Sequence, residues 1–248
     1  MSTLHSAIFV LHILFGSMAL VLFWLPLATK KGSLDHVKFG RYYGNVMYVV
    51  AGSGATMALL VIYAPLTIKH QLALTSTNPE ALALNLRVFW SFLLYLSLIT
   101  FTSIRHGALV IRNKRQHSHM RSWAHLGTIA LLFAGGLGVM TLGVLYENIL
   151  HLVFAMLGIV LALQMARFCL AKTVSANAWL LEHLGAFIGS GIGAYSAFIA
   201  FGGRQIFSEL GELQTIFWIA PGVIGGIGIS RMSGKYRGGL AGVQKVTS

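Results

Sequence analysis

The chain has 248 residues, of which 56% are apolar and only 10% are charged, and its formal net charge is +12. Soluble domains average about 45–50% apolar and about 25% charged residues, so this composition excludes an ordinary soluble domain. The basic residues are spread over several connecting segments. This spread excludes a nucleic-acid-binding groove, which needs clustered positive charge.

Seven apolar stretches follow one another along the chain, and each approaches the length of about 20 residues that crosses a bilayer as a helix. Only helices and closed barrels satisfy their backbone hydrogen bonds without water, and these runs lack the alternation of barrel strands. The predicted spans are residues 6–28, 45–66, 88–110, 123–145, 148–170, 182–202 and 214–230. We therefore expect an all-α polytopic membrane protein, in which residues 1–248 form a single transmembrane domain, a seven-helix bundle.

Local signals between the spans predict how the chain turns. The first span is expected to remain as a helix, because no basic residue precedes it and no small-residue cleavage site follows it. In the longest outer segment, Asn78 is placed to cap a helix that starts at Pro79, so a short interfacial helix is expected before the third span. Tyr146, Glu147 and Asn148 predict a tight turn between spans four and five.

The basic residues predict the orientation. Fifteen of the lysines and arginines fall on the segments after spans one, three, five and seven, whereas only Lys69, Arg87 and Arg204 fall on the other side. The positive-inside rule then places the N-terminus outside and the C-terminus in the cytoplasm. The partners expected from this pattern are the lipid bilayer and, at the cytoplasmic loops, anionic lipids.

Histidine is the residue type that carries the candidate chemistry, since the chain has ten histidines and only six acidic residues. Ionisable residues inside spans are costly and point to function. An outer layer holds His12 and His151, and an inner layer, roughly 20 Å away at 1.5 Å per residue, holds His106, His125 and His183. His36, His117 and His119 lie in the loops just beyond the inner layer.

Two layers of histidines on different helices are what a protein needs to hold two b-type haems for electron transfer across a membrane. The haem ligands would come from His12 with His151, and from His106, His125 and His183. The alternative is structural, because such histidines also sit at interfaces or bond between helices. A redox partner or a homo-oligomer is compatible with this hypothesis.

Two other hypotheses come from the same residues. His106, His125 and His183 offer three nitrogen ligands to zinc, as in an intramembrane hydrolase, with Glu182 as the one inner-face glutamate. The polar side chains along spans two and three favour a small-molecule carrier or binding protein instead. The single cysteine, Cys169, is interpreted as a small buried hydrophobic residue.

Two inner segments, residues 36–43 (HVKFGRYY) and 119–124 (HMRSWA), together with Leu11, His12 and Gly16, resemble a bacterial family of predicted multi-span membrane proteins of unknown function (DUF2306-like). The likeness covers roughly residues 10–140, and Val37 departs from the usual His-Arg pair. It implies a bacterial inner-membrane protein without an assigned activity, and it points to His12, His36, His119 and Arg121.

The two inner segments also carry cations that can work with a cofactor. His36 and Arg41 with His119 and Arg121 form, if they face inward, a cationic cluster suited to a haem propionate or an anionic substrate. If they face lipid, the same residues anchor the helix starts at the interface through anionic headgroups.

Overall fold

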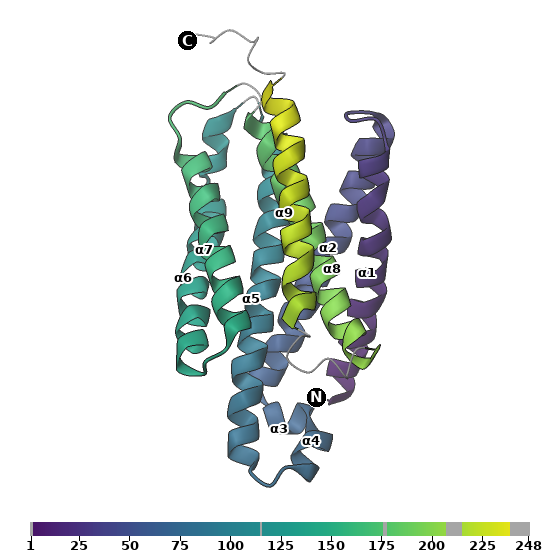
Figure 1. Ribbon diagram of the computed structural model, residues 1–248, viewed down its shortest axis with the longest axis vertical. Coiled ribbons are helices and arrows are strands. Elements are labelled where there is room, and N and C mark those ends of the chain that lie inside the picture. The colour runs from purple at the N-terminus through teal and green to yellow at the C-terminus, as the bar shows by residue number, and fades with distance from the viewer. Residues whose placement is uncertain (1, 115, 176–177, 207–214, 239–248) are drawn as a thin grey trace. The chain divides into compact units, whose positions relative to one another are not determined.

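The computed structural model describes residues 2–114, 116–175, 178–206 and 215–238. These residues are almost entirely helical, and no strand occurs among them, which confirms the predicted all-α class. The long helices are α1 (Ser2–Ala28), α2 (Leu34–Tyr63), α5 (Pro79–Arg112), α6 (Trp123–Leu145), α7 (Ile149–Leu170), α8 (Ala178–Ile206) and α9 (Thr215–Gly238) (Figure 1). The short ones are α3 (Pro65–Ile68), α4 (His70–Thr75) and the 3₁₀ turn η1 (His117–Arg121).

Two helices begin well before the spans predicted for them, and capping side chains explain why. Ser33 Oγ accepts a hydrogen bond from the backbone N–H of His36 at 3.2 Å, which starts α2 at Leu34. Asn78 Oδ1 accepts from the N–H of Ala81 at 3.0 Å, so the predicted cap is confirmed. The helix it starts at Pro79 continues into the third span without a break, in place of a separate interfacial helix.

The turn between α6 and α7 is confirmed as a tight one. Glu147 adopts a positive φ of 51°, a left-handed conformation that few residues other than glycine adopt. Asn148 then caps α7, because its Oδ1 accepts hydrogen bonds from the N–H groups of Leu150 at 3.1 Å and His151 at 3.4 Å. Helix α6 has the bounds predicted from the sequence.

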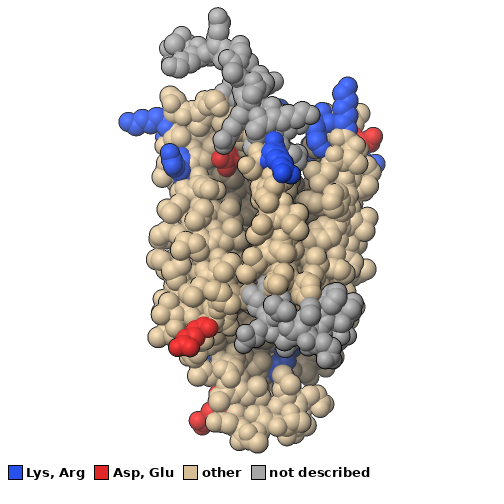
Figure 2. Space-filling model, in the orientation of Figure 1, with Lys and Arg blue, Asp and Glu red and all other residues tan. Residues whose placement is uncertain are grey.

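Six of the described helices are long and apolar enough to cross a membrane: α1, α2, α5, α6, α7, and α8 as far as Phe201. This finding indicates a multi-pass membrane protein. Helix α9, the predicted seventh span, is not among the six found in the part of the chain that the structure describes. Uncharged side chains cover most of the visible surface (Figure 2), and large apolar residues such as Val10 and Val21 are exposed, as expected for a surface in lipid.

The chain divides into two compact units, and α5, α6 and α7 run through both. The first unit contains the residues up to Thr102 together with Ala130–Ala162, and α1 packs against α2 within it. The second contains Ser103–Ile129 together with the residues from Leu163 onward, and α8 packs against α9 within it (Figure 1). Each unit has its own buried polar side chains.

Glycine allows the helices of the first unit to approach closely around Tyr95. This tyrosine is 3% exposed, and its Oη donates a hydrogen bond to the carbonyl of Leu132 at 3.2 Å. A Cβ atom added to Gly136 would lie 2.6 Å from Tyr95 Oη and from Cγ1 of Ile159. Small residues at such crossings let helix backbones pack tightly, which holds helices together in lipid.

The substitution Gly136→Ala is therefore expected to destabilise the first unit by about 1–3 kcal/mol, the usual cost of overpacking. The measurement is the midpoint of thermal unfolding in detergent. Gly138→Ala on the same helix is the matched control, because an added Cβ there meets nothing within 4 Å. Equal melting midpoints for the two variants would contradict this account of the packing.

Candidate metal centre

Four helix ends in the second unit carry the candidate site. Helix α5 ends at Arg112, α6 begins at Trp123, α7 ends at Leu170 and α8 begins at Ala178. The side chains of interest lie within about two turns of these ends: His106 on α5, His125 on α6, Cys169 on α7 and Glu182 on α8. Successive helices run in opposite directions, so the end of one lies near the start of the next.

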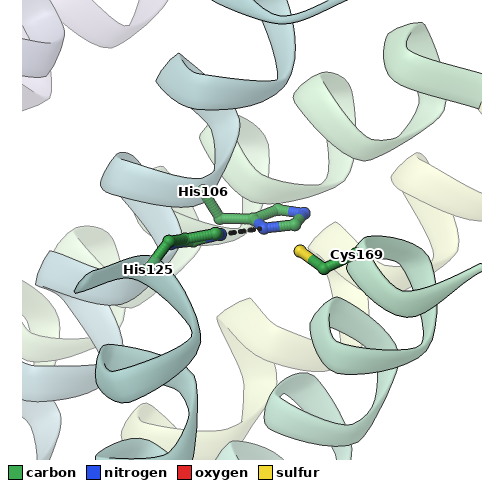
Figure 3. Close-up of side chains that lie close together, drawn as sticks. All are labelled: His106, His125 and Cys169. Carbon is green, nitrogen blue, oxygen red and sulfur yellow. Dashed lines mark hydrogen bonds between the residues drawn. The ribbon is translucent and has the colours of Figure 1, made fainter. Parts of the chain in front are cut away.

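His106, His125 and Cys169 form a compact buried group (Figure 3). One potential ligand atom from each lies within 4.8 Å of the others, and the exposed fractions are 1%, 0% and 0%. His106 Nδ1 lies 3.1 Å from His125 Nε2, and the two rings are stacked with centroids 5.3 Å apart. No other such group of three histidine, cysteine or acidic side chains occurs in the part of the chain that the structure describes.

A carboxylate orients this group from outside. Glu182 Oε2 lies 3.1 Å from His106 Nε2, so the ring donates its Nε2–H to the carboxylate and keeps Nδ1 unprotonated. His125 then donates its Nε2–H to that nitrogen, which leaves His125 Nδ1 buried and without a hydrogen-bond partner among the described residues. A carboxylate behind a histidine is the usual support of a histidine that binds metal, since it fixes the tautomer and the ring orientation.

The distances fit two ligands of one small ion. With metal–nitrogen bonds of about 2.0–2.1 Å, two imidazole nitrogens lie about 3.3 Å apart in a tetrahedral site and about 4 Å apart when they bind on opposite sides. The observed 3.1 Å between His106 Nδ1 and His125 Nε2 is a hydrogen-bond length that is also close to the tetrahedral value, so an ion bound here would replace that hydrogen bond and the His125 proton would lie on Nδ1. A thiolate belongs about 3.6 Å from each nitrogen at a zinc–sulfur bond of about 2.3 Å, so Cys169 would move by at most about 1 Å.

The same distances bear on two predicted ligand sets. Axial haem ligands approach the iron from opposite faces of the macrocycle with their nitrogens about 4 Å apart, whereas His106 Nδ1 and His125 Nε2 are in direct contact at 3.1 Å. His183, the predicted third zinc ligand, lies outside the compact group: its Nδ1 faces the carbonyl of Gly107 at 3.4 Å and its ring packs on Phe187. Two of the predicted inner histidines, His106 and His125, therefore lie together with Cys169, and His183 is not part of this group.

The two outer-layer histidines lie in the first unit and bind separate partners. His12 Nδ1 lies 2.9 Å from Ser53 Oγ, and this hydroxyl itself donates to backbone carbonyls of α2, so His12 is the donor in that bond. His151 donates its Nε2–H to the carbonyl of Val88 at 3.2 Å and packs against Phe92. Haem binding by these two residues stays a prediction.

The predicted inner cations are divided between the two units. His36 donates from Nδ1 to the carbonyl of Pro26 at 2.9 Å, and Arg41 is exposed in the same unit. In the second unit His119 is exposed, and Arg121 donates from Nε to the carbonyl of Cys169 at 3.1 Å and from Nη2 to that of Ala171 at 2.9 Å. Arg121 thus satisfies carbonyls at the end of α7, and an inward cationic cluster stays a prediction.

Cys169 is the candidate ligand that the sequence analysis did not assign. Its burial was expected, and the thiol is fully buried as a small hydrophobic residue would be. The sequence did indicate how deep Cys169 lies in the membrane. It is near the inner end of the fifth predicted span, at the same depth as His106 near the end of the third span and His125 near the start of the fourth. Thiolate and imidazole are ligands that zinc and copper share, so depth and residue type together would have made Cys169 a candidate without fixing its partners.

Comparison with known proteins adds no relative: no family model, no curated protein and no solved structure matches this chain. The chemistry of the site is accordingly inferred from its own residues and distances.

Replacing Arg121 by Gln is expected to loosen the end of α7 and speed the modification of Cys169 by a maleimide, because the side chain no longer holds two terminal carbonyls. The chain has one cysteine, so mass spectrometry of the intact protein reports this thiol alone. The control is Arg112→Gln, a change at an exposed arginine at the end of α5. Modification at the same rate in both variants would show that Arg121 does not hold this end.

Proposed function

We propose that this protein binds a single transition-metal ion, zinc in the first instance, through His106, His125 and Cys169. The observation that carries the proposal is the 3.1 Å separation between two buried imidazole nitrogens with a buried thiol beside them. Two imidazoles and a thiolate suit zinc, and copper is the other ion that favours this set. Bound zinc would supply a Lewis acid in a site closed to bulk water.

Glu182 acts in this proposal as a positioning residue. Its carboxylate accepts from His106, which presents the other ring nitrogen of that histidine toward Cys169 and His125. It is the only acidic residue in the described part of the second unit. Glu182 is engaged in orienting a ligand, and the described part of the unit has no other carboxylate that could act as a general base. The proposal is therefore limited to metal binding and does not include hydrolysis.

The expected result is one zinc per chain after the detergent-purified protein is stripped with chelator, reloaded and analysed by mass spectrometry of the metal. His125→Gln and Cys169→Ser should each weaken binding at least tenfold, and Glu182→Gln by roughly tenfold, as for other residues that support a ligand. With cobalt in place of zinc, the thiolate-to-cobalt absorption should vanish in Cys169→Ser. His119→Gln, at an exposed histidine of the same unit, is the control.

Unchanged metal content in both ligand variants, or no retained metal in the parent protein, would contradict the proposal. Circular dichroism and size-exclusion profiles show whether each variant is folded, and the cobalt spectrum is read only beside them. Reconstitution with haemin tests the haem hypothesis separately. A haem absorption band that depends on His106 and His125 would replace zinc by haem at this site.

We further propose that the chain crosses a bacterial inner membrane seven times, with α9 as the last span, the N-terminus outside and the C-terminus in the cytoplasm. The distribution of basic residues supports this orientation, and anionic lipids at the cytoplasmic loops follow from it. Kinship with the DUF2306-like family of predicted membrane proteins is part of the same proposal. It rests on the HVKFGRYY and HMRSWA segments.

A reporter at the C-terminus decides between six and seven spans. With seven, a C-terminal alkaline phosphatase fusion should be inactive and a C-terminal fluorescent protein should be bright. With six and the same N-terminal side, the two readouts exchange. A phosphatase inserted between α4 and α5 is the internal control and should be active, since an outer position is proposed for that segment in either case.

A further inference from the structure

A cavity of about 200 Å³ lies at the basic end of the second unit. Its volume exceeds the share of one water molecule, about 30 Å³, and is below the roughly 300–1,000 Å³ of sites for drug-sized ligands. It has room for a small molecule of a few non-hydrogen atoms. The lining residues that matter are Val110, Asn113, Lys114, His117, Phe168 and Trp179.

The charge around the cavity favours an anion. Lys114 is an exposed residue, and its ammonium group lies 5.2 Å from the centroid of the Trp179 ring, so a cation–π contact holds it at the cavity. The one acidic residue in the described part of this unit, Glu182, bonds to His106 and does not line the cavity. Other basic residues of this unit include Arg105, Arg112, Arg121, Arg167 and Lys172.

Two polar side chains of the cavity lack strong partners. His117 Nε2 is buried and has no hydrogen-bond partner among the described residues, although the ring is fixed edge-on against Phe168 at 4.9 Å. Among the described residues, Asn113 Nδ2 donates only to the sulfur of Met120 at 3.6 Å, and a thioether is a weak acceptor. Buried polar groups in native proteins are usually satisfied, so a ligand oxygen is the partner that suits His117 Nε2, and the amide of the half-buried Asn113 can donate to the same ligand.

We propose that this cavity binds a small oxyanion, a carboxylate or a phosphate that carries a short apolar group. Lys114 supplies the charge, and His117 and Asn113 supply hydrogen bonds. Val110 and the Phe168 and Trp179 rings contact the apolar group. No side chain of the cavity belongs to the proposed metal group, so this binding does not depend on metal.

The test is a titration of the full-length protein in uncharged detergent with inorganic phosphate and with butyrate, at constant ionic strength, followed by the thermal unfolding midpoint. Both anions should raise the midpoint to a plateau. Lys114→Gln should weaken the apparent affinity at least tenfold, and His117→Gln should weaken it as well. Lys172→Gln removes an exposed lysine of the same unit that does not line the cavity, and it should bind as the parent does.

Equal anion affinity in Lys114→Gln and Lys172→Gln would overturn the proposal, and so would an unfolding midpoint that rises without reaching a plateau. Either result would mean that the anions act through the overall positive charge of the protein and not through a specific site. The same titration in Cys169→Ser separates this site from the metal group. Retained binding supports an independent cavity, and lost binding would overturn it in favour of an anion on the metal.

Lipid headgroups carry the same oxyanion, so the source of the ligand needs its own comparison. Mixed micelles with phosphatidylglycerol should compete with phosphate in the parent protein if the natural occupant is a headgroup, and mixed micelles with phosphatidylcholine at the same content give the baseline. Competition by phosphatidylglycerol that persists in Lys114→Gln would overturn the cavity as the binding place. Absence of competition assigns the cavity to a soluble anion.

Discussion

The lack of water inside a bilayer determines the helical structure of most of this chain, because a backbone in lipid has to form its hydrogen bonds within the protein. The six long apolar helices meet this requirement. In the second unit the connections from α5 to α6 and from α7 to α8 bring the end of one helix near the start of the next. Polar side chains near those ends then meet, and His106 bonds to Glu182 across 76 positions of sequence.

Within this frame the buried polar side chains differ in how fully they are satisfied. His151 bonds to a backbone carbonyl and Tyr95 to another, which lowers the cost of placing them among apolar residues. His106 uses both ring nitrogens, one on a carboxylate and one on a second imidazole. That second imidazole, His125, is fully buried, and its Nδ1 has no hydrogen-bond partner among the described residues, so its burial is less well compensated than that of His106.

Local signals in the sequence predicted local structure well. The bounds of α6, the cap at Asn78 and the turn at Glu147 each depend on a few neighbouring residues, and all three are confirmed. The partners of Cys169 depend on how each helix is rotated about its own axis. Helices α6 and α7 are apolar on all sides, so no amphipathic pattern fixes that rotation in the sequence. The sequence therefore predicted how deep Cys169 lies in its helix, but it did not predict which side chains Cys169 contacts.

One turn of α7 touches both proposed sites. The ring of Phe168 lies 5.8 Å from that of His106 and 4.9 Å from that of His117, and the next residue is Cys169. Arg121 holds this turn through the carbonyl of Cys169. No side chain serves both sites, so any coupling between them would have to pass through a shift of this turn. Such a link is reciprocal: any change in metal affinity caused by the anion equals the change in anion affinity caused by the metal.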